Sequence, residues 1–450
     1  MSYKNKLENL IPGGAHTYSR GSDQFPINAP EILSRGKGAY VWDEKKNKYL
    51  DYGMALRANT LGYSNKKINR AAINQINLGN NFTRPSEIEL KAAECFVKNI
   101  PSADMVKFAK NGSNVTTAAI KLARSSTGRN YIAIPRQHPF YSFDDWFIST
   151  TPIKRGTSPD SSKYVLLFDY GNLDSLINLF DQFPNQIAGV MLEPATSEIP
   201  IKVNSIELDD IKQDDNILHS DLNFLFSVQN LCKDKGSLFI LDEMITGFRW
   251  HLKGAAYYFG VEPDLITFGK AMANGFSISA LGGKKEIMEL GSINIPNLER
   301  TFLLSSTHGA EMCSLGAFVQ TVEFYKRKNV CSHLWKYGIE LKNSFNNLSQ
   351  NHNLRDYLYM IGPGICLNYI CKDNNLLISS EFRTLFSQEM IKRRILMPWI
   401  SISYSHGKRE MNKTLNALDD VMQIYKKALS EGVHKYLEGP SIKPVFRKYN

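Results

Sequence analysis

The chain has 450 residues, 43% of them hydrophobic and 22% charged, which is the composition of a folded globular protein and argues against disorder. No run of about 18 apolar residues occurs, and the N-terminus lacks the apolar stretch of a secretory signal, so we expect a cytoplasmic protein that does not enter a membrane. The net charge is +10, yet the basic residues are dispersed and no aromatic residues interleave with them, so we expect no nucleic-acid partner.

The first predicted element is a β-hairpin in the segment 39–53, AYVWDEKKNKYLDYG, where two apolar runs flank a charged turn. From about residue 55 to 310, short apolar runs then alternate with helix-period segments such as 115–124, VTTAAIKLAR. This alternation predicts right-handed crossovers in a largely parallel sheet, with ligands at the carboxyl ends of the strands. The runs lie at 105–109, 131–134, 164–168, 187–192, 237–241, 265–268 and 278–281.

Beyond residue 309 the pattern changes to long helical stretches, at 315–328, 381–394 and 414–432, with a strand-like run at 365–372 between them. We therefore predict three parts: an N-terminal segment 1–54 that contributes to a small domain, a large domain over 55–310, and a C-terminal small α+β domain over 311–450. The polar, acidic stretch 203–221 interrupts the step from strand to helix and predicts a surface loop.

Two side chains with useful chemistry are predicted at the ends of neighbouring strands. In LFILDEMITGFR, 238–249, an apolar strand delivers Asp242 and Glu243 to its carboxyl end, where a buried carboxylate could hold a cation. In DLITFGKAMANGF, 264–276, Lys270 follows a strand and a glycine, where a partly desolvated amine has a lowered pKa and can form an imine.

A third feature is the segment 108–126, FAKNGSNVTTAAIKLARSS, which runs from a strand through Gly112 to Ser113 at a predicted helix N-cap, a place that suits a phosphate. Each signal alone is weak, because strand-end carboxylates are usually turns or caps and most such lysines face solvent. Together they supply what pyridoxal phosphate requires: an imine-forming lysine, an anion for the ring nitrogen and a phosphate cradle. The six cysteines form no CxxC pair or cluster with histidine, so we expect reduced thiols and no metal site.

These residues resemble the class III aminotransferases of fold type I, and specifically the branch around glutamate-1-semialdehyde 2,1-aminomutase. The resemblance implies an α/β fold with a large domain built on a mostly parallel seven-stranded sheet, a smaller α+β domain from the N- and C-terminal segments, pyridoxal phosphate as cofactor, and a homodimer that shares its active sites. The likeness covers nearly the whole chain, through IPGGAHTYSR (11–20), YVWDEKKNKYLDY (40–52), NGSNVTTAAIKLAR (111–124), GVMLEP (189–194), LDEMITGFR (241–249), TFGKAMANGFSISALGG (267–283) and SSTHGAEMCSLGA (305–317).

Carried over by position, the resemblance implies that Lys270 holds the cofactor as a Schiff base and shuttles the substrate proton once it is freed. Asp242 would then pair with the pyridine nitrogen, and Ile245 would pack on one face of the ring. Gly112 and Ser113 would bind the phosphate.

The resemblance also implies roles outside these motifs. Thr307 would reach the phosphate of the neighbouring subunit, which requires a homodimer. Phe140 stands where the family has the aromatic residue that stacks on the cofactor, and Tyr141 then replaces the family histidine. Glu193 matches a glutamate near the active site, although an ordinary strand-end residue before a proline turn fits it equally well.

The chain departs from the family pattern at positions that concern the substrate. Asn114 replaces the glutamate of the Gly-Thr-Glu-Ala motif. Leu56 and Arg57 replace part of the aminomutase Ser-Trp-Gly-Pro stretch, so Arg57 could bind an acidic substrate bidentately or form an ordinary structural ion pair. The segment 397–407, MPWISISYSHG, lacks the acidic residue of the corresponding aminomutase loop, which argues against true aminomutase activity.

The leading hypothesis is an aminotransferase that works in two half-reactions. An amino donor would convert the cofactor to pyridoxamine phosphate, and an aldehyde or ketone acceptor would then receive the amine. The alternative is glutamate-1-semialdehyde 2,1-aminomutase, which moves an amine between neighbouring carbons of one substrate. A non-catalytic binding or scaffold protein is the third reading, and the retained lysine and phosphate motif argue against it.

Overall fold

The computed structural model describes residues 2–138, 140–196, 198–201, 215–309 and 311–449. The chain divides into two compact units, which we call unit 1 (Met1–Asn65 with Ser332–Asn450) and unit 2 (Lys66–Cys331). The three-part division expected from the sequence uses other boundaries and stays a prediction. Most of the polar stretch 203–221 lies outside the described residues, and its end forms the short helix α9 (Asp215–Leu218).

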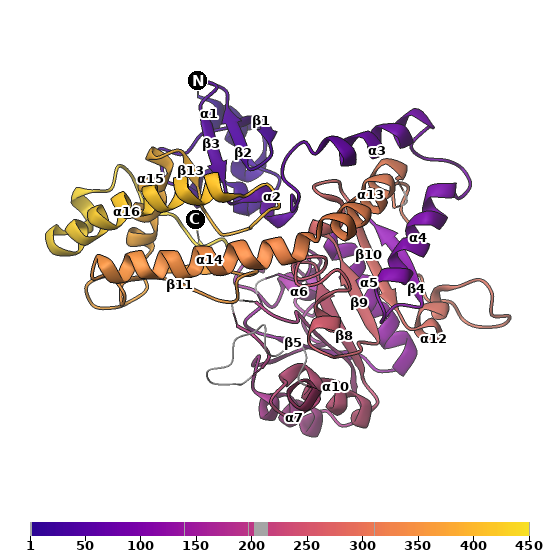
Figure 1. The fold of residues 1–450 in the computed structure, drawn as a ribbon. Helices are drawn as coiled ribbons and strands as arrows, with labels where there is room; N and C mark the ends of the chain where they lie inside the picture. Colours follow the sequence, from indigo (N-terminus) through magenta and orange to yellow (C-terminus); the bar gives the residue numbers. More distant parts are fainter. Residues whose placement is uncertain (1, 139, 197, 202–214, 310, 450) are drawn as a thin grey trace. The chain divides into compact units, whose positions relative to one another are not determined.

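Unit 2 is built on a seven-stranded sheet with the strand order β4-β10-β9-β8-β7-β5-β6 (Figure 1). Strand β10 runs antiparallel to β4 and β9, and the other neighbouring strands are parallel. All seven apolar runs of the sequence form strands, which confirms the predicted α/β fold with its mostly parallel sheet. The strands are β4 Met105–Ala109, β5 Tyr131–Pro135, β6 Val165–Phe168, β7 Ile187–Leu192, β8 Leu238–Glu243, β9 Leu265–Phe268 and β10 Ser279–Gly283.

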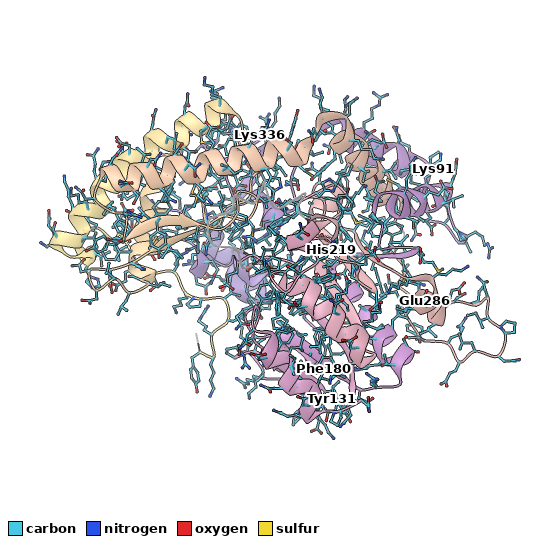
Figure 2. All side chains as sticks on the ribbon, turned by 60° about the horizontal axis from the view of Figure 1, so that its bottom comes forward. Lys91, Tyr131, Phe180, His219, Glu286 and Lys336 are labelled. Atoms are coloured by element: carbon cyan, nitrogen blue, oxygen red, sulfur yellow. The ribbon has the colours of Figure 1, made fainter. Side chains whose placement is uncertain are left out.

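Helices pack against this sheet because its central strands are apolar on both faces, as strand β7, buried along its whole length, shows. Helix α5 packs directly on the sheet, where small side chains such as Ala118, Ala119 and Ala123 let it approach the strands. Charged side chains such as Lys91 project from the outer helices (Figure 2). The other helices of unit 2 are α3 Lys66–Asn77, α4 Glu87–Asn99, α6 Asp145–Ile148, α7 Leu173–Gln182, α10 Phe224–Lys235, α11 Ala255–Tyr258, α12 Lys285–Met288 and α13 Met312–Lys328, α5 itself spanning Gly112–Thr127.

Unit 1 contains a four-stranded sheet with the order β1-β2-β3-β13. Strands β2 and β3 form the predicted hairpin, with Tyr40 opposite Leu50, and β13 adds parallel to β3. Strand β12 realises the predicted run at 365–372 and pairs antiparallel with β11. The elements are α1 Tyr3–Leu10, β1 Leu33–Lys37, β2 Tyr40–Asp43, β3 Lys48–Asp51, α2 Met54–Arg57, β11 Leu358–Ile361, β12 Asn368–Cys371, α15 Ser380–Lys392, β13 Ile395–Leu396 and α16 Lys408–Glu431, while α14 (Val330–Asn351) begins at the end of unit 2.

The C-terminal tail after α16 is fixed to unit 1 by hydrogen bonds to two different segments. Its backbone at Lys443 donates to the Asp23 carbonyl at 3.0 Å and accepts from the Gln24 amide side chain at 3.0 Å. Arg447 forms an ion pair with the Asp23 carboxylate at 2.5 Å. On the other side, the N–H of Ile442 donates to the Thr384 hydroxyl of α15 at 2.9 Å. The tail therefore ties the N-terminal segment to α15.

Three sequence expectations concern the chain as a whole. Within the described residues, no helix combines the length and apolarity that crossing a bilayer requires. The six cysteines are free thiols, as expected. Among the same described residues, no group of three or more metal-ligating side chains comes together.

Candidate cofactor site

Lys270 lies immediately beyond strand β9, where the backbone turns sharply. The strand ends at Phe268, Gly269 is extended, and Lys270 takes a positive φ of 37° at the start of a short 3-10 turn, Lys270–Ala273. A non-glycine residue in this region is strained, and such strain concentrates at functional sites. The turn directs the half-buried lysine to the carboxyl edge of the sheet, where the parallel-sheet argument places a ligand.

Asp242 is the buried carboxylate of this edge. It is the second-to-last residue of β8 and lies opposite Thr267 of β9 in the register of the two strands. Its Oδ1 accepts the Thr267 hydroxyl at 2.9 Å and the backbone N–H of Met244 at 3.0 Å. Burial raises the pKa of Asp242, while the Met244 N–H and the positive charge of Lys270 act in the opposite direction. The carboxylate and the lysine therefore interact electrostatically.

Glu243, the next residue, has a different environment because successive side chains of a strand point to opposite faces. Its carboxylate accepts the backbone N–H groups of Ala255 at 2.7 Å and Ala256 at 2.8 Å, and the Thr246 hydroxyl at 3.1 Å. The two N–H groups belong to the start of α11, and the hydroxyl belongs to the turn that follows β8. Glu243 therefore links this turn to the start of α11. Burial raises the pKa of Glu243 to about 7, and the three donors oppose that rise.

The N-terminus of α5 faces the same edge. Asn111 caps the helix by accepting the N–H of Asn114 at 3.1 Å, and no backbone partner among the described residues takes the N–H groups of Gly112 and Ser113. A helix N-terminus with free N–H groups binds phosphate well. The Ser113 hydroxyl also accepts the N–H of Phe143 at 3.0 Å, which fixes the loop after β5.

Met244 connects the helix N-terminus to the lysine turn. A Cβ atom added at Gly112 would lie 2.9 Å from the Met244 sulfur, and one added at Gly269 would lie 2.6 Å from it. Glycine at both positions therefore allows both backbones to approach one thioether. The arrangement brings Lys270, Asp242 and the N–H groups of α5 around one place, which fits the amine, ring-nitrogen and phosphate needs of pyridoxal phosphate.

The loop after β5 contains a pairing that the sequence did not reveal. Phe140 is 46% exposed and meets Phe147 edge-on at 5.8 Å, so its ring has an open face. Tyr141 is buried, and its hydroxyl forms a hydrogen bond with Nδ1 of His138. The backbone N–H of Glu193 donates to the same nitrogen at 3.2 Å. Burial lowers the pKa of His138 to about 3, so the imidazole is neutral.

Thr307 lies in an exposed loop before α13. The side chain of Asn81 donates to its carbonyl at 2.8 Å, and Asn80 caps α13 through the N–H of Cys313 at 3.0 Å. An ion pair between Lys110 and Glu311 joins this loop to the segment before α5. Thr307 itself faces solvent in the single chain.

Arg57 belongs to unit 1, whereas every other candidate residue lies in unit 2. It ends the short element α2, in which four consecutive residues have positive φ angles: Met54 42°, Ala55 50°, Leu56 59° and Arg57 71°. This is a left-handed turn, and it contains no glycine. Ile245, by contrast, directly follows Met244 and is half-buried in unit 2.

Three side chains brace the left-handed turn. The Asp51 carboxylate accepts the N–H groups of Gly53 at 2.7 Å and Met54 at 3.1 Å. The Tyr63 hydroxyl donates to Asp51 at 2.5 Å and accepts the N–H of Ala55 at 3.0 Å. The indole of Trp399 donates to the Gly53 carbonyl at 2.9 Å. These bonds offset a conformation that costs about 1–2 kcal/mol per residue.

Comparison with known proteins identifies the family. Residues 17–362 match the family model described as aminotransferase class-III. The chain belongs to the class-III aminotransferases. This match confirms the resemblance predicted from the sequence and the prediction that the protein is an enzyme of this family. It also confirms the predicted cofactor, because pyridoxal phosphate is typical of the family.

Two relatives named as aminomutases and one solved structure are similar to this class-III aminotransferase. It is 29% identical to a glutamate-1-semialdehyde 2,1-aminomutase of Wigglesworthia glossinidia brevipalpis, over 94% of this chain and 98% of the relative. It is 25% identical to the aminomutase of Alkaliphilus metalliredigens, over 91% and 92%. The FumI protein of Sphingopyxis sp., solved in its PLP internal aldimine form, superimposes with a TM-score of 0.82 at 26% identity, covering 95% of this chain and 97% of that one.

Sequence reasoning found the ends of the strands but missed the residues that hold them. Thr267 and Met244, which contact Asp242 and the two glycines, carried no signal beyond their positions in apolar runs. The His138–Tyr141 pair had a weak signal, since a polar ring three residues from a tyrosine occurs within one short loop. The tail had none.

Proposed function

We propose that this chain is an aminotransferase in which Lys270 bonds covalently to pyridoxal phosphate and amino groups pass from a small amino donor to an aldehyde or ketone acceptor. The observation that carries the proposal is the position of the buried Asp242 and of Lys270 at the carboxyl ends of two adjacent strands, where the charge of the lysine acts to lower the pKa of the carboxylate. A carboxylate that only stabilised a turn would not need to be buried and to accept the Thr267 hydroxyl, as Asp242 does. A lysine that only faced solvent would not need the strained backbone of Lys270.

The roles of the residues follow from their positions. When bound, pyridoxal phosphate acts as an electron sink for the charge released at the substrate Cα. Asp242 would keep the proton on the ring nitrogen, because its free oxygen positions lie in a dry site where a charge interaction is strong. Lys270, displaced by the substrate amine, would take and return the proton at Cα.

The phosphate and the ring would be held by residues around this pair. Gly112 and Ser113 would bind the phosphate through the N–H groups of α5. Ile245 would pack on one face of the ring, and the open face of Phe140 would stack against the other. Glu193, buried beside His138, would shape the substrate side.

We also propose a homodimer in which Thr307 serves the site of the neighbouring subunit. Supporting this, Thr307 is exposed, and the loop that holds it is flanked by exposed apolar side chains: Ile76 is 50% exposed, Leu78 63% and Phe82 52%. Surfaces of this kind mark protein–protein contacts. Sedimentation of the purified protein tests this part of the proposal, and a monomer at micromolar concentration contradicts it.

The second candidate is the aminomutase, which the names of the relatives favour. The loop 397–407 argues against it, because it contains no acidic residue and its Ser401, Ser403 and His406 are buried. An acidic amino donor fits Arg57, because the guanidinium would bind the side-chain carboxylate of such a donor.

One experiment separates the two functions. In one arm, cofactor-loaded protein is mixed with a panel of amino donors while the visible absorbance of the bound cofactor is followed. In the other arm, the same protein is mixed with glutamate 1-semialdehyde alone. We expect a donor to bleach the absorbance and a carbonyl acceptor to restore it. Turnover of glutamate 1-semialdehyde with no response to any donor would instead establish the aminomutase.

A further inference from the structure

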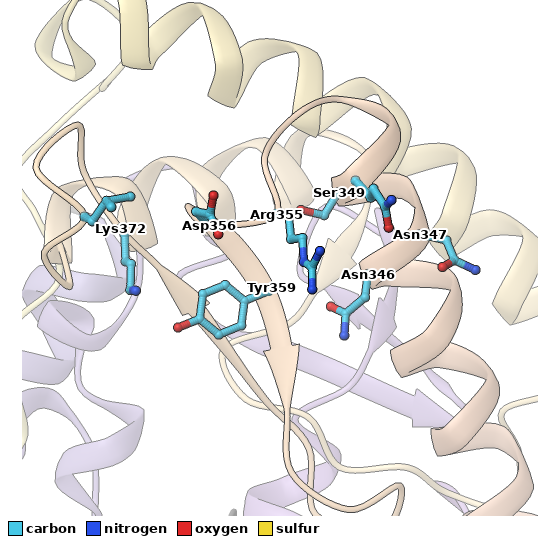
Figure 3. Close-up of a pocket in the computed structure, with 9 residues that line it drawn as sticks. Asn346, Asn347, Ser349, Arg355, Asp356, Tyr359 and Lys372 are labelled. Carbon is cyan, nitrogen blue, oxygen red and sulfur yellow. The ribbon is translucent and has the colours of Figure 1, made fainter. Parts of the chain in front are cut away.

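Unit 1 contains a polar hollow that is lined by residues from the segment 346–376 alone. Its volume is about 560 Å³, which lies within the range of binding sites for small molecules. The wall comes from the C-terminal end of α14, the loop after this helix, strand β11 and the turn after β12. Figure 3 shows these residues, among them Arg355, Tyr359 and Lys372. Every lining side chain except Leu376 carries a polar or charged group, so the hollow suits a polar ligand.

Two of the polar side chains hold the wall of this hollow in place. The Asn346 amide donates to the Met360 carbonyl at 3.0 Å and accepts the Met360 N–H at 2.8 Å. The Ser349 hydroxyl donates to another carbonyl of β11 at 2.5 Å. On the side of β12, the hydroxyl of the buried Tyr425 donates to the Lys372 carbonyl at 2.7 Å. Hydrogen bonds therefore fix the backbone around the hollow, and a ligand would not have to order it.

The remaining polar side chains of the wall do not have such a structural role. Within the described residues, no hydrogen bond or ion pair involves four of these side chains, those of Asn347, Gln350, Arg355 and Asp356. The Lys372 ammonium forms no ion pair in this part of the chain either, and it lies 5.3 Å from the centre of the Tyr359 ring. These groups are therefore available to bind a ligand.

The charged groups that line the hollow favour an anion. Arg355 and Lys372 are cations, and Asp356 is the single acidic residue among those that line it. Asp373, the neighbour of Lys372 in the chain, does not line the hollow, and its carboxylate accepts two backbone N–H groups of its own turn at 2.9 and 3.1 Å. A guanidinium with its fork of donors and an ammonium on one wall suit a phosphate group.

The uncharged groups of the wall, together with Asp356, suit hydroxyl groups. The amides of Asn347 and Gln350 can each donate and accept a hydrogen bond, and the Asp356 carboxylate can accept one. An apolar ligand body would gain little here, because Leu376 is the one aliphatic side chain among the lining residues. A body with several hydroxyl groups would instead pair with the amides and the carboxylate.

We propose that this hollow binds a phosphomonoester of a small polyhydroxylated molecule, such as a sugar phosphate or a sugar-alcohol phosphate. The phosphate would lie at Arg355 and Lys372, and the hydroxyl groups would bond to Asn347, Gln350 and Asp356. This proposal does not depend on the proposed aminotransferase activity, because none of the lining residues is a candidate cofactor or substrate residue of that reaction.

The test uses the full-length, cofactor-loaded protein, so that the phosphate of the cofactor already occupies the cofactor site. Isothermal titration calorimetry measures the binding of sorbitol 6-phosphate, which has no carbonyl group and cannot serve as an amino acceptor. Sorbitol and inorganic phosphate are titrated separately. We expect sorbitol 6-phosphate to bind saturably and at least about tenfold more tightly than either fragment, because both parts of it contact the wall. Absence of saturable binding, or equal binding of inorganic phosphate, overturns the proposal.

Two pairs of variants place the bound molecule in the hollow. Lys372→Gln should weaken the binding of sorbitol 6-phosphate about tenfold, the loss expected for one charge-assisted hydrogen bond, whereas Lys408→Gln, at an exposed position of unit 1 outside the hollow, should leave it unchanged. Asn347→Ala should weaken it about fivefold, and Asn343→Ala, one turn earlier on α14 and also exposed, should have no effect. Equal binding by either variant and its control overturns the proposal.

Discussion

The adjacent carboxylates Asp242 and Glu243 give the sharpest prediction, because the same chemical change should have opposite consequences at the two positions. Glu243 uses both oxygens to accept the N–H groups of Ala255 and Ala256. In Glu243→Gln one oxygen becomes an NH2 group that faces a buried N–H. A buried donor without an acceptor costs about 1–3 kcal/mol, so we expect the free energy of unfolding to fall by that amount.

Asp242→Asn should behave differently. Its hydrogen bonds to Met244 and Thr267 both end on Oδ1, which the asparagine carbonyl can replace. Loss of the buried charge removes its desolvation cost and also its attraction to Lys270, and these two effects on stability oppose each other. We therefore expect a change in unfolding free energy smaller than that of Glu243→Gln, while amino transfer falls by two or more orders of magnitude.

Urea denaturation measures the change in unfolding free energy. The variants are denatured without cofactor, because bound cofactor would itself contribute to the measured stability. Single-turnover reaction with an amino donor measures the effect on amino transfer. Should Glu243→Gln lose amino transfer while keeping its stability, and Asp242→Asn unfold more easily, the two roles assigned here are exchanged and the account of the site is wrong.

Three further variants test other features. Lys270→Ala should eliminate both the visible absorbance of bound cofactor and turnover, and retained turnover would contradict its role. Arg57→Ala should raise the KM for an acidic substrate and leave the cofactor spectrum unaltered; an unchanged KM removes Arg57 from the site. Ala55→Gly should raise the free energy of unfolding by about 0.5–1 kcal/mol because glycine relieves a left-handed residue, whereas Ala93→Gly, inside the right-handed helix α4, should lower it by about 1 kcal/mol. Equal losses would show that the turn is not left-handed in solution.

The sequence predicted the sheet of unit 2 well because its strands are short apolar runs bounded by turn residues, and the burial of β7 on both faces is visible in its composition. Asp242 and Lys270 could be predicted for the same reason: they sit where such runs end. Their electrostatic pairing required only that the two strands be neighbours.

The remaining features could not be predicted because they depend on distant contacts. No local preference places Met54, Ala55, Leu56 and Arg57 in a left-handed turn, and it exists only because Trp399 and other remote groups hold it. Motif reasoning likewise treated Glu243 as a second candidate for a cation, since the backbone that it binds begins twelve residues later.

The division of the chain also affects how the protein is made. Unit 1 combines residues 1–65 with residues 332–450, so a ribosome completes all of unit 2 before it supplies most of unit 1. The nascent N-terminal segment must wait, without its partners, until Lys443 and Arg447 emerge. Translation that stops a few residues early would therefore release a polypeptide with an intact large sheet and a loosely anchored beginning, a product that quality-control proteases would recognise by its first residues rather than its last.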